Sequence, residues 1–347
     1  MDCQTSASSR RSRSNSPLLE PYCDDFLPAN APDPAKLYPW VTAKSSQSED
    51  PMVQMHEEMM DFYDFVQPSQ GEVKAHNEVL ERIEKVVKRL WPGTQIKSFG
   101  SLKTGLWLPN SDMDLAVFTP NRLLSTKYLI KELALELNFR KILCYQERVF
   151  RARVPILKLR DQKTAIPVDI CFNIENGVTG VDMVKAYMDR YPEAKYITIV
   201  LKYFLRQRAL NETYSGGIGS FLLFCTVIAG LQEHRRRFPQ GGKFTLAHYF
   251  LHYLHFYGYE LDISETGLRI AGTGAVFPKP PNSPALLTLI CPQDDEHDIG
   301  QNSFHFEKVQ EAFAAAYEVM MVQPFRKSGL TPLSCIIRAD RSMLERR

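Results

Sequence analysis

The segment from residue 99 to residue 118 restricts the possible folds of this chain more than any other part of the sequence. Its second half alternates between polar and apolar side chains, which is typical of a β-strand with one buried face. Upstream of this strand, Gly100 and Ser101 predict a turn with an exposed backbone. Asp112 and Asp114 are two positions apart, so we expect both carboxylates on the same face of the strand.

Two carboxylates on one strand face repel each other unless a cation or a proton lies between them. An isolated Asp-x-Asp pattern is more often a simple turn at the start of a strand. A third carboxylate, Asp169, favours a metal site, because it is the one charge in the apolar stretch 165–172. A buried carboxylate is costly unless it is paired or bound to a metal. Three acids from two strands could hold two Mg²⁺ ions for phosphoryl transfer.

In their order along the chain, these residues resemble the active-site pattern of the DNA polymerase β nucleotidyltransferase superfamily. The longer segment 99–115 is similar to the atypical, TRAMP-type poly(A) RNA polymerases, which are template-independent enzymes that extend RNA 3′ ends. The resemblance covers roughly residues 52–322. It also includes Phe172-Asn173, Asn176-Gly177-Val178, Leu201-Lys202, Phe204-Leu205 and Gly216-Gly217-Ile218-Gly219-Ser220.

The resemblance implies a two-metal mechanism that uses Mg²⁺, with Mn²⁺ as the alternative ion and ATP as the expected substrate. Asp112 and Asp114 would bind both ions, and Asp169 would bind the one that activates the RNA 3′ hydroxyl. Asp169 is also the expected general base, although metal-bound hydroxide or solvent could serve instead. Gly100 and Ser101 would bind the triphosphate.

Several other positions match nucleotide-binding residues of the family. Asn176, with Gly177 beside it, matches the ribose-binding position, although an Asn there could simply form a turn. Lys202 matches a triphosphate contact from the helical domain, or it is a lysine that extends its charge out of an apolar face. Ser220 begins a predicted helix, where an anion is favoured and where Ser is also a common N-cap. Phe221 replaces a tyrosine of the family and retains only the stacking surface.

The segment 292–303 resembles the base-recognition motif of the family. His297 stands where adenylating relatives have Asn, and Gln301 stands where they have Arg. Some uridylating relatives have a histidine at the position of His297. The chain as a whole resembles the adenylating group, so the leading hypothesis is an adenylyltransferase. A uridylyltransferase and an inactive RNA-binding scaffold are the alternatives.

The predicted fold is α+β with two domains, a nucleotidyltransferase palm and a mainly helical central domain, with the active site in the cleft between them. Glycine and proline in the segment 272–284 predict a loop. The expected segments are a disordered Ser/Arg/Pro-rich tail (1–50), N-terminal helices that pack on the central domain (51–90), the palm (91–177), the central domain (178–322) and a basic C-terminal tail (323–347).

Composition limits the class of protein. The chain has 347 residues, of which 44% are hydrophobic, enough for two cores. Its apolar runs are too short to span a membrane, and no secretory signal is visible. The seven cysteines form no CxxC pair, which favours a reducing compartment, the nucleus or the cytosol. The net charge is only +2 and no RNA-recognition motif is visible, so we expect a separate RNA-binding partner protein.

Overall fold

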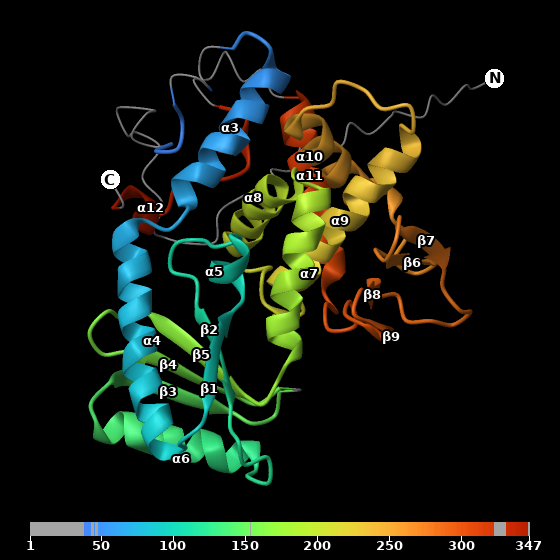
Figure 1. Cartoon of the computed structure of the whole chain (residues 1–347). Helices are drawn as coiled ribbons and strands as arrows, with labels where there is room; N and C mark the ends of the chain where they lie inside the picture. Colours follow the sequence, from blue (N-terminus) through green and yellow to red (C-terminus); the bar gives the residue numbers. More distant parts are fainter. Residues whose placement is uncertain (1–37, 43–44, 46–47, 153, 323–330, 346–347) are drawn as a thin grey trace, which may run out of the picture.

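Two β-sheets and a bundle of helices make up the part of the chain that the structure describes (Figure 1). The computed structural model describes residues 38–42, 45, 48–152, 154–322 and 331–345. No helix in these ranges is long and apolar enough to cross a membrane. The cysteines in the same ranges are all free thiols.

The first sheet is mixed, as predicted for the palm. Its strands are β1 (Gln95–Phe99), β2 (Met113–Phe118), β3 (Leu143–Val149), β4 (Ile156–Asp161) and β5 (Pro167–Phe172). They lie in the order β1-β2-β5-β4-β3, with β2 parallel to β5 and the other neighbours antiparallel. Side chains such as Leu115, Val117 and Ile170 alternate with polar ones and point into a core shared with helices α4 (Gln70–Leu90) and α6 (Thr126–Phe139).

The second core lies within a bundle of helices, which confirms the predicted two-part α+β fold. Its helices are α3 (Pro51–Val66), α7 (Asn176–Arg190), α8 (Ala194–Arg206), α9 (Ser220–Arg237), α10 (Leu246–His255) and α11 (Phe306–Val322). Within the bundle, α8 packs on α3 and α9, and its apolar residues Ile197, Leu201 and Phe204 are fully buried. Burial of such side chains is the main stabilising contribution in a bundle of this kind.

The N-terminal helices divide between the two cores, whereas the sequence prediction placed both on the central domain. Met59 and Phe62 of α3 are buried in the helical core, but Val79 and Ile83 of α4 are buried against the first sheet. The prediction was wrong for α4. A capping box on Ser69 starts α4 as a separate helix, so its apolar stripe can face a different partner from that of α3.

A second sheet interrupts the helical domain and was not predicted. Its strands are β6 (Thr266–Arg269), β7 (Ala275–Pro278), β8 (Thr288–Cys291) and β9 (Asp294–Asp298), in the order β7-β6-β8-β9. The segment 272–284, predicted as a loop, contains β7. Strands of four or five residues are too short to show a clear period in the sequence.

The C-terminal segment 331–345 is packed on α8, so the prediction of a basic tail is wrong for these residues. Leu333, Ile337 and Met343 are buried in the helical core. Two side chains bind its backbone: the Tyr203 hydroxyl of α8 donates to the Arg338 carbonyl at 2.7 Å, and Arg208, just after α8, donates to the Ile336 carbonyl at 3.0 Å. The segment ends in α12 (Arg341–Leu344), and α8 is also the helix that carries Lys202.

The predicted N-terminal tail is also ordered at its end, because Tyr38 and Trp40 are buried in the helical core. Residues 1–37 of that tail lie outside the described residues. Glu58 of α3, itself only 1% exposed, joins this region to the C-terminal segment. Its carboxylate accepts hydrogen bonds from the Trp40 indole N–H at 3.0 Å, the Leu333 backbone N–H at 2.9 Å and the Thr331 hydroxyl. Burial raises the pKa of Glu58 to about 7, against the opposing effect of these three hydrogen bonds.

Glu58→Ala is expected to lower the free energy of unfolding by about 2–4 kcal/mol, because it leaves two buried donors and one part-buried hydroxyl without this acceptor. Glu78→Ala, which removes an exposed glutamate from α4, is the control and should change stability little. Chemical denaturation of both variants measures the difference. Equal denaturation midpoints for the two variants would contradict the role assigned to Glu58.

Candidate active site

Asp114 and Asp169 lie side by side on the two parallel strands of the first sheet. The register pairs Asp114 of β2 directly with Asp169 of β5, so both carboxylates project from the face of the sheet that α4 and α6 leave open. Asp112 lies immediately before β2 and is exposed. The backbone thus brings the three predicted acids to one end of two neighbouring strands.

Gly100 lies against the side chain of Asp114. It joins β1 to the short helix α5 (Ser101–Thr104) with φ 70° and ψ −152°, a region that is essentially restricted to glycine. An added Cβ would overlap the Oδ2 atom of Asp114 and lie 2.7 Å from its Cγ. Ser101 begins α5, so the predicted Gly-Ser turn is the start of a one-turn helix next to the acids.

The three acids disfavour each other's negative charge. Burial, followed by the charges of Asp169 and Asp112, raises the pKa of Asp114 to about 7. Burial also raises the pKa of Asp169, although Lys158 opposes this effect. The Lys158 Nζ atom donates to Asp169 Oδ2 at 3.0 Å. Lys158 was missed in the sequence because its pairing with Asp169 depends on the register between β4 and β5.

The chemistry of this donor set fits a divalent cation. Carboxylate oxygens are the ligands that Mg²⁺ and Mn²⁺ prefer, and a cation would offset both the burial and the repulsion that raise the pKa of Asp114. Within the described ranges, no three His, Cys, Asp or Glu side chains are already grouped closely enough to hold an ion. Asp169 is instead paired with Lys158, which supplies one positive charge to the acids.

Lys202 of α8 approaches the acids from the helical domain. Its Nζ atom donates to the backbone carbonyl of Leu106 at 3.0 Å, in the loop that leads from α5 to β2. Burial lowers the pKa of Lys202 to about 8, and the negative charge of Asp114 opposes this change. One turn later, Arg206 donates to the Pro109 carbonyl in the same loop at 2.8 Å. The structure therefore brings Lys202 within electrostatic reach of Asp114 and Asp112.

Glu212, which the sequence prediction missed, also faces the acids from the helical domain. Its carboxylate is within electrostatic reach of Lys158, Asp112 and Asp169, and burial raises its pKa. The residue lies in the loop between α8 and the glycine run, which has no pattern that marks a site. Two charged residues, Lys158 and Glu212, thus extend the predicted set.

Asn176 and Gly177 form the beginning of α7, next to the Gly-Ser turn. A Cβ on Gly177 would lie 2.8 Å from the ring of Phe99, the last residue of β1. This close approach places the start of α7 beside Gly100.

Ser220 and Phe221 are the first two residues of α9, and both are exposed. Ser220 is not the N-cap, since that position is Gly219, which has no side chain to cap the helix. The glycine run before them passes close to the end of the preceding loop, because a Cβ on Gly217 would overlap the carbonyl of Leu210.

The predicted base-recognition segment packs on α7, and the chain just after it contacts the glycine run before α9. His297 lies half-buried on β9, and Gln301 lies exposed in the turn that follows. The hairpin that carries His297 reaches α7, where the Gln293 amide donates to the Thr179 hydroxyl at 3.2 Å. Further along, the His305 backbone N–H donates to the carbonyl of Gly216 in the glycine run at 2.9 Å.

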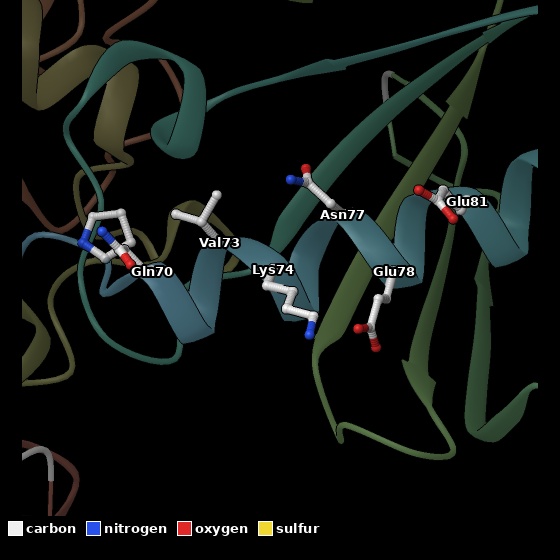
Figure 2. A pocket seen from close by; sticks show the side chains of 7 residues that line it. Gln70, Val73, Lys74, Asn77, Glu78 and Glu81 are labelled. Atoms are coloured by element: carbon white, nitrogen blue, oxygen red, sulfur yellow. The ribbon is translucent and has the colours of Figure 1, made fainter.

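An open hollow along α4 contains none of these residues. Figure 2 shows the side chains that line it along one face of α4. The lining residues are Pro68, Gln70, Val73, Lys74, Asn77, Glu78 and Glu81. Two acidic side chains and one lysine give this hollow no chemistry comparable to that of the three aspartates.

Residues 55–189 match the model described as the central palm domain of mitochondrial-like poly(A) RNA polymerase. Over 278 residues the chain is 31% identical to Trf4-2, an inactive poly(A) RNA polymerase protein of Drosophila melanogaster, with 76% of this chain and 67% of that protein covered.

A fungal relative and a solved structure extend the match. The chain is 32% identical over 289 residues to poly(A) RNA polymerase CID14 of Cryptococcus neoformans, which covers 80% of this chain. It spans only 38% of the length of that relative. The polymerase core of TRAMP, an RNA surveillance complex, has a TM-score of 0.77 at 27% identity and covers 86% of this chain and 99% of that one.

Proposed function

Because this chain belongs to the atypical poly(A) RNA polymerase family, we propose that it is a template-independent nucleotidyltransferase that adds AMP from ATP to RNA 3′ ends. One observation supports this proposal above all others. Asp114 and Asp169 lie side by side on paired strands, and Lys202 of the helical domain is within electrostatic reach of Asp114 and Asp112. Carboxylates opposite a lysine suit the transfer of a nucleotide from a triphosphate.

In the proposed reaction the RNA 3′ oxygen bonds to the α-phosphorus of ATP while the bond to the pyrophosphate oxygen breaks. Asp169 accepts the proton of the 3′ hydroxyl, and Lys158 holds its carboxylate in position. Lys202 and the backbone around Ser101 bind the triphosphate and the departing pyrophosphate. Asp112, Asp114 and Asp169 would hold the Mg²⁺ or Mn²⁺ ions, which supply charge neutralisation at the phosphates when bound.

The experiment that tests this function incubates the purified full chain with single-stranded RNA, Mg²⁺ and one nucleoside triphosphate at a time. We expect extension of the RNA with ATP. Extension with UTP alone would establish a uridylyltransferase. RNA binding without extension with any nucleotide would establish an inactive scaffold; the name of the Drosophila relative describes that protein as inactive.

The uridylyltransferase is the second candidate because of His297. Its imidazole is half-buried on β9, in the hairpin that contacts the start of α7. A ring there could exclude a purine, while its N–H donates to a pyrimidine carbonyl. Gln301, in place of an arginine, removes a charge from the same segment.

His297→Asn is expected to shift the ratio of AMP to UMP incorporation toward AMP by about ten- to a hundred-fold, the usual value of one polar contact in a binding pocket. The measurement is direct competition of equal ATP and UTP concentrations in tailing assays. Asp295→Asn changes an exposed residue of the same strand and serves as the control. If both variants retain the parent ratio, His297 does not read the base.

The chain's net charge of +2 gives little general attraction for RNA. A separate RNA-binding protein would therefore deliver the substrate, in the nucleus or alternatively in the cytosol. Surface plasmon resonance at physiological salt would measure the RNA affinity of the chain alone, and tight binding would argue against the need for a partner.

A further inference from the structure

The open face of the first sheet continues beyond the catalytic acids toward its edge strand. The register pairs Asp114 with Asp169, Asp169 with Lys158, and Lys158 with Glu147. Directly paired residues on neighbouring strands project from the same face. One row of charged side chains therefore crosses β2, β5, β4 and β3 in that order.

A second row lies two residues further along the strands on the same face. Arg160 of β4 is paired with Tyr145 of β3 on one side and with Pro167 of β5 on the other. Arg160 is exposed and donates to the Ala165 carbonyl at 3.1 Å. Tyr145 is 52% exposed, and its hydroxyl donates to Glu147 Oε2 at 3.1 Å. An aromatic ring and a guanidinium thus lie next to each other in solvent.

The sides of the active site differ in what they can hold. Toward β1, Gly100 and Ser101 lie against Asp114, and this is the side proposed for the triphosphate. The RNA, whose 3′ hydroxyl attacks near Asp169, must approach from another direction. Toward β4 and β3 the sheet face is open, and by strand geometry Tyr145 lies about 12 Å from Asp169.

We propose that Tyr145 and Arg160 form a binding site for the nucleotides just upstream of the RNA 3′ end, an inference that rests on the proposed function. The Tyr145 ring stacks on a base, and Arg160 contacts the phosphate that follows it. Stacking on an aromatic ring tolerates any base, and a single-stranded 3′ end offers unpaired bases for it. The occupant is single-stranded RNA, because an RNA whose 3′ end lies at Asp169 would cross β5 and β4 to reach Tyr145.

Glu147 makes this site weaker than its other residues allow. Its carboxylate is exposed between Tyr145 and Lys158, on the path of the RNA phosphates. Repulsion between this carboxylate and the RNA phosphates opposes binding. Replacing Glu147 with Gln keeps the acceptor for the Tyr145 hydroxyl and removes the repulsion, so it should have the opposite effect to loss of Tyr145 or Arg160.

The test uses the full chain and a short unstructured RNA, and it measures the KM for RNA, the KM for ATP, and RNA binding by fluorescence anisotropy. Tyr145→Ala should raise the KM for RNA by at least about five-fold and leave the KM for ATP unchanged. Arg160→Ala should raise the KM for RNA and reduce the dependence of RNA binding on salt. Glu147→Gln should lower the KM for RNA.

Tyr128→Ala and Arg140→Ala are matched controls, since α6 lies on the opposite face of the sheet. Tyr128 is 49% exposed, close to the value for Tyr145, and Arg140 is likewise an exposed arginine. The proposal is overturned if Tyr145→Ala and Arg160→Ala weaken RNA binding no more than these controls do. If the parent binds RNA through Tyr145 but adds no nucleotide, the proposed function fails while this binding site stands.

Discussion

Asp114→Asn is expected to reduce RNA tailing by at least about 1,000-fold while the fold remains intact. The substitution keeps the shape of the side chain, so it opens no cavity in the sheet. It removes one of the three negative charges that would hold the catalytic cation, and the paired Asp169 cannot replace it. Primer extension with labelled RNA, Mg²⁺ and ATP measures the activity, and thermal unfolding measures the fold.

The unfolding temperature of Asp114→Asn gives a second, independent test of this prediction. Burial, together with Asp169 and Asp112, raises the pKa of Asp114 to about 7 from an ordinary value of 3.8. A carboxyl with a raised pKa binds its proton more tightly in the folded state. Its contribution to stability is therefore complete below about pH 4 and is lost as the pH rises through 7. Without metal at pH 8, Asp114→Asn should unfold at the same or a higher temperature than the parent.

Asp182→Asn, an exposed substitution on α7, is the control for both measurements. It should leave tailing and the melting temperature unchanged. Near-normal tailing by Asp114→Asn would remove Asp114 from the catalytic set. A melting temperature far below that of the parent would mean that Asp114 stabilises the fold as a charged group.

The placement of Asp114 beside Asp169 could be predicted because each residue has a local signal in the sequence. Asp114 interrupts the apolar positions of one strand, and Asp169 is the one charge in another. Lys158 and Glu212 carry no such signal. Lys158 is one of many lysines until the β4–β5 register places it opposite Asp169, and Glu212 depends on how a loop of the helical domain approaches the sheet.

Long-range packing also explains the errors in the predicted domains. The apolar stripe of α4 shows that one face is buried, but it does not say whether the partner is the sheet or the helical bundle. The C-terminal segment 331–345 has an irregular backbone, so its apolar residues follow no helical or strand period in the sequence. Its order comes from the Arg206–Asp340 ion pair at 2.8 Å and from Tyr203, both supplied by α8 more than a hundred residues earlier.

Gly100→Ala is the second substitution with a large expected effect, a loss of at least about 100-fold in tailing. Two costs arise at this position. The backbone angles of Gly100, φ 70° and ψ −152°, are unfavourable for alanine by about 1–3 kcal/mol, and the added Cβ would overlap the Asp114 carboxylate. Either Asp114 moves away from Asp169, or the turn that starts α5 changes. Both outcomes misplace groups that must be positioned to within about 1 Å.

Gly241→Ala separates the two costs. Gly241 has a φ of 71°, and a Cβ there would meet no atom within 4 Å, so the substitution adds backbone strain without a clash. Both variants should lose some thermal stability from the positive φ. Only Gly100→Ala should lose tailing as well, because only its new methyl group reaches a catalytic carboxylate. Equal activity of the two variants would show that contact between Gly100 and Asp114 is not required, and that the turn acts on the triphosphate through some other group.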